Sequence, residues 1–265
     1  MQVLQSRKLQ LDRAYSPSDR INLLIFAAFL GYAEVVKLVV KEKLNIFNNE
    51  LNCIIKFDSS TPLIVASREG HVTVVEYLLK CGAKINGADK YGRTPFFEAS
   101  SSGHEKTLEY LAKNGANINR SDKYDRTPLF AASSNGHEKI IECLVKCGAK
   151  INHTNKYGRT PLFVASLNGH QKTVECLAKC GAKINRADND GRTPLFAASS
   201  NGHEKIIEYL VKFGAAVNHV DDSGWTPLYA ASWNNHLKAV ECLMKSGAET
   251  KRDDNDGWTP LFAAS

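Results

Sequence analysis

The chain has 265 residues and a formal net charge of +6 at pH 7. Its composition, 43% hydrophobic and 23% charged, is that of an ordered globular protein and argues against an intrinsically disordered chain. We find neither a long uncharged apolar stretch nor a signal-peptide pattern, and the seven cysteines follow no disulfide framework. We therefore expect a cytoplasmic or nuclear protein without a transmembrane segment.

A period of 33 residues organises the predicted elements. Thr-Pro pairs begin at positions 61, 94, 127, 160, 193, 226 and 259. A fixed period of this length is typical of one helical supersecondary unit copied in tandem. Stacking explains the residues that recur in every copy, so the function must be sought in residues that differ between copies.

One copy shows how its residues predict two helices. Thr193 can cap a helix whose first residue is Pro194, because proline needs no N–H partner there and already has a helical φ. Gly202 and Gly214 follow two apolar runs, where a left-handed residue ends a helix. Each predicted helix has about eight to ten residues, too short to be stable alone, so neighbouring copies must bury it.

The period divides the chain as follows. Residues 1–18 are expected to be a flexible N-terminal segment, and residues 19–57 a divergent first repeat. Six regular 33-residue repeats are predicted over 58–255, followed by a truncated eighth repeat over 256–265. The sequence stops halfway through a predicted helix, and we expect the natural chain to continue.

The order Asp-x-x-Gly-x-Thr-Pro-Leu, then Ala-Ala and Gly-His, resembles the ankyrin repeat family over about residues 19 to 265. The resemblance implies an all-α solenoid of stacked helix-turn-helix units with β-hairpin-like turns. Asp125 and Asn235 stand where turn glycines are usual and are expected to be left-handed. Where the family usually has histidine after Thr-Pro-Leu, we expect apolar packing between repeats from Ile64, Phe97, Phe130, Phe163, Phe196, Tyr229 and Phe262.

The same resemblance implies the function. Ankyrin repeats hold partners in a concave groove that is lined by the turn tips and by the first helices. We therefore predict a scaffold or adaptor, acting as a monomer without a cofactor, that binds a partner protein or peptide. The matching partner-binding positions are Lys90, Tyr91, Arg93, Lys123, Tyr124, Arg126, Lys156, Tyr157, Arg159, Leu167, Arg192, Trp225 and Trp233.

Lys-Tyr-x-Arg occurs at three successive turn tips, at 90–93, 123–126 and 156–159. Formal charge is positive around these tips and negative around the last two, which favours a partner that is acidic where it meets the middle repeats. One alternative is an anion-binding module for nucleic acid or acidic lipid, although the acidic last repeats count against it. Another alternative is that the tip residues are simply solvent-exposed and were copied when repeats were duplicated. Residues 126–148 and 192–214 differ at only two positions, which is consistent with duplication.

Trp233 stands where neighbouring repeats have Ser134, Leu167 and Ser200. Two interpretations remain open for it, namely contact with a partner and packing on a tryptophan of an adjacent turn.

Little in the sequence suggests catalysis. The histidines before each second helix recur with the period, which indicates a role in the fold, and no nucleophile with a placed base is recognisable. Two hypotheses fit the cysteine pairs of neighbouring second helices, namely a tetrahedral zinc site and small hydrophobic residues near a helix surface, and we favour the second. The paired cysteines are Cys143, Cys147, Cys176 and Cys180.

Overall fold

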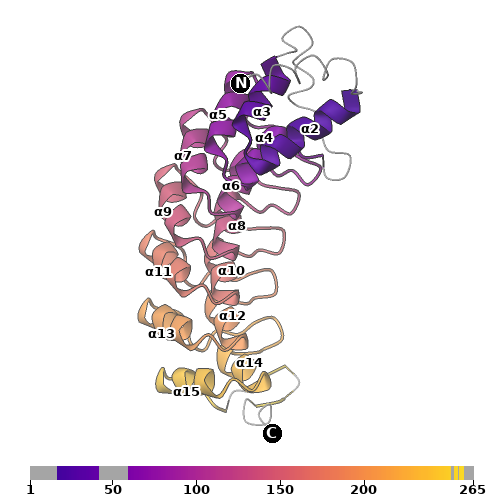
Figure 1. Cartoon of the computed structure of the whole chain (residues 1–265). Helices are drawn as coiled ribbons and strands as arrows, with labels where there is room; N and C mark the ends of the chain where they lie inside the picture. Colours follow the sequence, from indigo (N-terminus) through magenta and orange to yellow (C-terminus); the bar gives the residue numbers. More distant parts are fainter. Residues whose placement is uncertain (1–16, 42–58, 252–253, 256, 260–265) are drawn as a thin grey trace. The chain divides into compact units, whose positions relative to one another are not determined.

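The computed structural model (Figure 1) describes residues 17–41, 59–251, 254–255 and 257–259. Most of the segment expected to be flexible, and most of the truncated eighth repeat, lie outside the described residues, as does Phe262. The described residues contain fourteen helices and no strand, which confirms the all-α repeat prediction.

The helices alternate between a first and a second helix of each repeat. The first helices are α2 (Pro17–Leu30), α4 (Pro62–Arg68), α6 (Pro95–Ser101), α8 (Pro128–Ser134), α10 (Pro161–Leu167), α12 (Pro194–Ser200) and α14 (Pro227–Trp233). The second helices are α3 (Ala33–Lys41), α5 (Val72–Lys80), α7 (Glu105–Lys113), α9 (Glu138–Lys146), α11 (Gln171–Lys179), α13 (Glu204–Lys212) and α15 (Leu237–Lys245).

The chain divides into two compact units, which are described separately. Unit 1 takes the residues up to 99 together with 104–117, and unit 2 takes 100–103 and the residues from 118 onward. Within unit 2, helices α8, α10, α12 and α14 follow one another in one layer, and α9, α11, α13 and α15 form a second layer beside them (Figure 1). We call these the first-helix layer and the second-helix layer.

The predicted helix starts are confirmed. Thr127 has an extended backbone, and its Oγ1 accepts a hydrogen bond from the backbone N–H of Phe130 at 3.2 Å, while Pro128 is the first residue of α8. The same threonine cap and proline start α10, α12 and α14. Each cap satisfies one of the amides that a helix start leaves without a partner.

The recurring glycine and histidine join neighbouring repeats. Gly136 has a φ of 75°, a conformation that only glycine adopts easily. A Cβ atom at Gly136 would lie 2.6 Å from Nδ1 of His170, so the histidine of the next repeat occupies the space that glycine leaves. His170 Nε2 lies 2.9 Å from the carbonyl oxygen of Ser134. The histidines therefore have the role in the fold that their periodicity indicates.

The residues after Thr-Pro-Leu are buried, as expected. Phe163 is 2% exposed and Tyr229 3% exposed, so aromatic side chains fill the first-helix layer of unit 2. Burying one such ring contributes about 2 to 3 kcal/mol, which short helices need from their neighbours. The left-handed expectation is confirmed as well, since Asp125 and Asn235 both have a φ of 58°.

Candidate functional site

Most turn tips are built around a buried carboxylate. In unit 2, Asp122 is 5% exposed, and its Oδ1 accepts hydrogen bonds from the backbone N–H groups of Tyr124 and Arg126, both at 2.9 Å. Its Oδ2 accepts a third from Nε of Arg126 at 2.8 Å. The tip is thus held by three bonds to one side chain, and the ring of Tyr124, 47% exposed, projects from a fixed backbone.

Backbone hydrogen bonds join consecutive tips of unit 2. The N–H of Lys156 donates to the carbonyl oxygen of Tyr124 at 3.1 Å, and that of Asn189 donates to Tyr157 at 3.0 Å. The following two tips are joined in the same way. We call the surface formed by tips 123–126, 156–159, 189–192 and 222–225 the turn edge of unit 2. Its backbone is pre-organised because each tip is bonded to the next.

Each arginine of the turn edge forms an ion pair with an aspartate, and the residue at position 155 affects which aspartate is the partner. Arg126 bonds Asp122 of its own turn, with Nη2 2.6 Å from Oδ2. In the next turn Asn155 takes the place of the aspartate and still accepts from the amides of Tyr157 and Arg159. Because its amide carries no charge, Arg159 instead bonds the carboxylate of the following repeat.

That change of partner continues along the turn edge. Nε of Arg159 lies 3.2 Å from Oδ2 of Asp188, and Nε of Arg192 lies 3.4 Å from Oδ2 of Asp221. Asp188 and Asp221 are 8% and 5% exposed. The positive charge of these arginines is therefore largely balanced by buried carboxylates one repeat away. The formal charges overstate how basic this edge is.

The exposed cations of the turn edge are lysines. Lys123 and Lys156 are both exposed, and neither forms an ion pair with a described residue. Beside Lys156, the ring of Tyr157 is 60% exposed. Lysine thus supplies the accessible positive charge of the middle tips and tyrosine their accessible aromatic area, while arginine anchors the backbone below them.

Aromatic stacking changes along the turn edge. The guanidinium of Arg192 lies 5.6 Å from the ring centre of Phe196. At the next tip Trp225 replaces the arginine and lies 4.6 Å from Tyr229, centre to centre. The ring of Trp233 lies 5.6 Å from that of Trp225 and is nevertheless 57% exposed. Trp233 therefore packs on its neighbour and also presents more than half of its surface to solvent.

The other predicted positions are placed as follows. Leu167 is half-buried at the end of α10, and its carbonyl oxygen lies 3.1 Å from Nε2 of His203. In unit 1, Lys90 is exposed with Nζ 5.0 Å from the ring centre of Tyr91. Arg93 bonds Oδ2 of Asp89 through Nε at 2.7 Å. All thirteen predicted residues lie at turn tips or on first helices.

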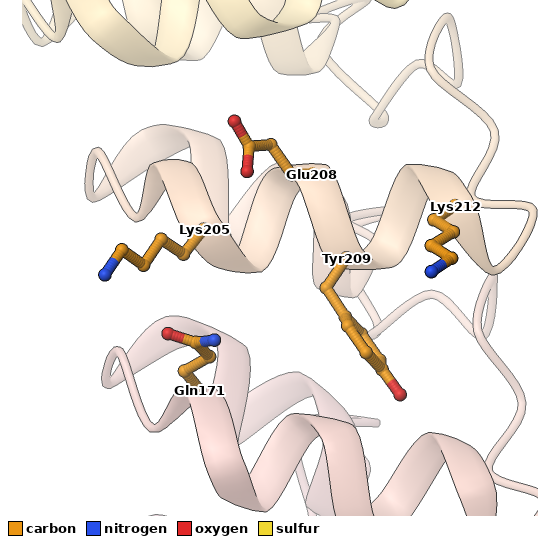
Figure 2. A pocket seen from close by; sticks show the side chains of 5 residues that line it. All are labelled: Gln171, Lys205, Glu208, Tyr209 and Lys212. Carbon is orange, nitrogen blue, oxygen red and sulfur yellow. The ribbon is translucent and has the colours of Figure 1, made fainter.

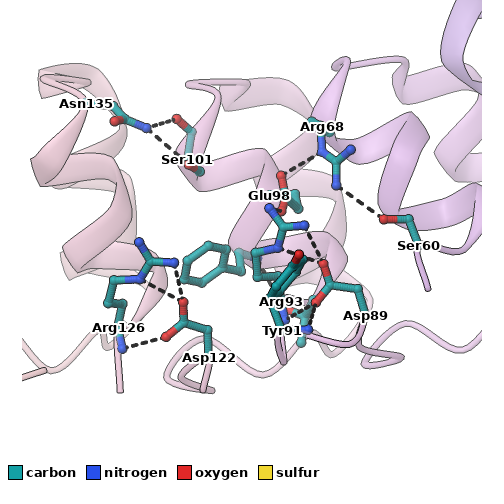
Figure 3. Close-up of polar contacts among 12 residues, drawn as sticks. Ser60, Arg68, Asp89, Tyr91, Arg93, Glu98, Ser101, Asp122, Arg126 and Asn135 are labelled. Carbon is teal, nitrogen blue, oxygen red and sulfur yellow. Dashed lines mark hydrogen bonds and ion pairs between the residues drawn. The ribbon is translucent and has the colours of Figure 1, made fainter. Parts of the chain in front are cut away.

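Unit 1 holds an ionic network that the sequence did not indicate (Figure 3). Glu98 is 4% exposed at a place where other first helices have alanine or valine. Its Oε2 accepts a hydrogen bond from Nε of Arg68 at 2.9 Å, and its Oε1 lies 3.0 Å from Nη1 of Arg93. Nη2 of Arg68 also donates to Oγ of Ser60 at 3.3 Å. One buried carboxylate thus joins the arginines of two successive repeats.

The cysteines of the second-helix layer provide no recognisable metal site. Cys147 is exposed, whereas Cys176 and Cys180 are half-buried. Burial, and then the nearby Cys180 thiol, raise the pKa of Cys176 to about 12, so it stays a neutral thiol at physiological pH. Among the described residues no group of three or more histidine, cysteine or acidic side chains is arranged to bind a metal.

Comparison with known proteins agrees with the geometry. A family model described as ankyrin repeats (3 copies) matches residues 23–122, 120–188, 180–254 and 221–265. No curated protein matches the sequence. None of the described helices is long and apolar enough to cross a membrane. The chain belongs to the ankyrin repeat family, whose repeats are generally protein–protein interaction modules and typically non-catalytic.

Proposed function

We propose that this chain is a binding scaffold, and in the cell an adaptor, that holds a partner protein or peptide along the turn edge and first-helix layer of unit 2. The observation that carries the proposal is the exposure of Trp233, which stays 57% accessible although its ring packs near that of Trp225. Tryptophan and tyrosine are the residues that most often dominate binding energy at protein interfaces, because they offer a large rigid area.

The chemistry of the surface suggests the chemistry of the partner. Opposite Lys123 and Lys156 the partner would carry acidic side chains, and opposite Trp233 it would carry an apolar or aromatic one. The binding residues proposed in this region are the lysines and tyrosines of the two middle tips together with Leu167, Trp225 and Trp233. Arg126, Arg159 and Arg192 contribute mainly by fixing the tips, since each already bonds a buried carboxylate.

The proposal can be tested with substitutions that install a residue already present at the same position of another repeat. Tyr157→Ser installs the residue that stands at the equivalent position 223, and Trp233→Ser installs that of position 200. Wild type and the double variant would be used to capture proteins from the native lysate. We expect the wild type to retain partners that the double variant loses, with both proteins showing the same thermal unfolding. Equal capture by the two would place recognition on another surface.

A further inference from the structure

The second-helix layer of unit 2 carries an aromatic pair that distinguishes two otherwise identical segments. Residues 126–148 and 192–214 have the same sequence except that Tyr209 and Phe213 replace Cys143 and Cys147. The two rings stack with their centres 4.5 Å apart and an angle of 20° between their planes. Phe213 is 40% exposed. Both differences between the duplicated segments therefore lie side by side, one on α13 and the other at its C-cap.

A surface pocket of about 390 Å³ lies beside Tyr209, between α11 and α13. It is lined by Gln171, Lys205, Glu208, Tyr209 and Lys212. Figure 2 shows the ring of Tyr209 pointing toward α11, while Glu208 points to the opposite side of α13. The tyrosine hydroxyl lies 3.4 Å from the carbonyl oxygen of Glu175, which holds the ring across the gap between the two helices.

The charges that line this pocket are two lysines and one glutamate, Glu208, which points away from α11 in Figure 2. Lys205 and Lys212 stand seven residues apart, about 10 Å along the helix axis. Both are exposed, and neither forms an ion pair with a described residue. On the other side of α13, the neighbouring pocket of about 350 Å³ is lined by three glutamates and two lysines. Tyr209, one ring of the aromatic pair, thus lines the more basic of the two pockets.

We propose that the pocket between α11 and α13 is a second docking site, which takes an acidic peptide segment bearing an aromatic or aliphatic side chain. The apolar side chain packs against Tyr209 and Phe213, and flanking carboxylates pair with Lys205 and Lys212. The site lies on the second-helix layer and uses no residue of the turn edge, so it goes beyond the proposed function and does not depend on it.

The duplicated segment supplies the matched variant. Tyr209→Cys with Phe213→Cys makes residues 192–214 identical to 126–148, a sequence that already folds in this chain. A displayed library of random peptides would be selected on the wild-type chain and on this variant in parallel. We expect the wild type to enrich peptides that combine acidic with aromatic or aliphatic residues and that the variant does not retain. A synthetic peptide of this class should bind the variant at least about tenfold more weakly.

Two further variants distinguish this site from others. Lys205→Gln with Lys212→Gln should weaken the same peptide and reduce the salt dependence of its binding, because the paired charges are lost. Trp233→Ser should leave its affinity unchanged. The proposal is overturned if no enriched peptide depends on the aromatic pair, if the dependent peptides lack acidic residues, or if their binding depends on Trp233.

Discussion

At the scale of single residues, Gly136 satisfies two constraints that can be separated. Its left-handed φ disfavours any side chain, and its Cβ position is occupied by the ring of His170. Gly148 has a similar φ of 87° but no atom within 4 Å of its Cβ position. We predict that Gly148→Ala destabilises the fold by about 1 to 2 kcal/mol and Gly136→Ala by about 2 to 4 kcal/mol. Urea unfolding measures both, and equal losses would show that the histidine ring moves aside freely.

The buried aspartates also allow a graded test. Asp122→Asn should keep the two bonds to the amides of Tyr124 and Arg126, as Asn155 does in the next turn, and lose only the ion pair. We expect the free energy of unfolding to fall by at most about 1 kcal/mol, since Arg126 is partly exposed. Asp122→Ala leaves two amides without an acceptor and should cost about 2 to 3 kcal/mol. A chemical denaturation series would rank the variants, and the reverse order would contradict this account of the turn.

The pKa of Cys176 predicts its reactivity. Because burial raises that pKa to about 12, the thiolate is scarce at pH 8, whereas Cys147 is exposed. Alkylation followed by peptide mass spectrometry should label Cys147 well before Cys176.

The raised pKa of Cys176 also determines how this residue affects the stability of the fold as pH changes. The folded pKa lies above that of an unfolded thiol, so the contribution of Cys176 is complete below about pH 9 and is lost as pH rises toward 12. Replacing Cys176 with alanine should therefore flatten the alkaline decline in stability, and an unchanged decline would argue against a buried neutral thiol.

At the scale of elements, the network around Glu98 links α4 and α6 within unit 1. Arg68→Ser and Glu98→Ala install residues found at equivalent positions in other repeats. Removing either side chain leaves the other with fewer hydrogen-bond and ion-pair partners. We therefore expect the double variant to lose less free energy of unfolding than the two single variants lose in sum. The predicted coupling, measured by a double-mutant cycle, is about 1 kcal/mol or more. Additive effects would mean that the pair contributes nothing to packing of the two helices.

The elements also show what a sequence can predict. Thr127, Pro128 and the glycines act on their own backbone, so helix starts, helix ends and the left-handed Asp125 could be predicted without coordinates. Which acidic side chain each arginine pairs with could not be predicted from the sequence. Glu98 and Arg68 are 30 residues apart, and the pairing of Arg159 with the next repeat follows from a single neutral residue in its own turn. Such choices depend on distances that exist only once the repeats have stacked.

At the scale of the whole molecule, the paired arginines affect the response to salt. A nucleic-acid site using the full basic ladder would lose about a thousandfold or more in affinity between low and physiological salt. The proposed partner site relies on aromatic area and on two exposed lysines of the turn edge. We expect partner affinity to change less than about tenfold over the same range. Binding isotherms at two salt concentrations decide this, and a steep loss would favour the anion-binding alternative.

The most direct test of the proposed function is calorimetric titration of a captured partner, purified, into three proteins. These are the wild type, the Tyr157→Ser and Trp233→Ser double variant, and the Tyr209→Cys and Phe213→Cys double variant. For a partner that binds the turn edge, the first double variant should bind at least about a hundredfold more weakly and the second as tightly as wild type. Unchanged affinity in the first double variant would contradict the claim that Trp233 and the turn edge of unit 2 form the binding surface.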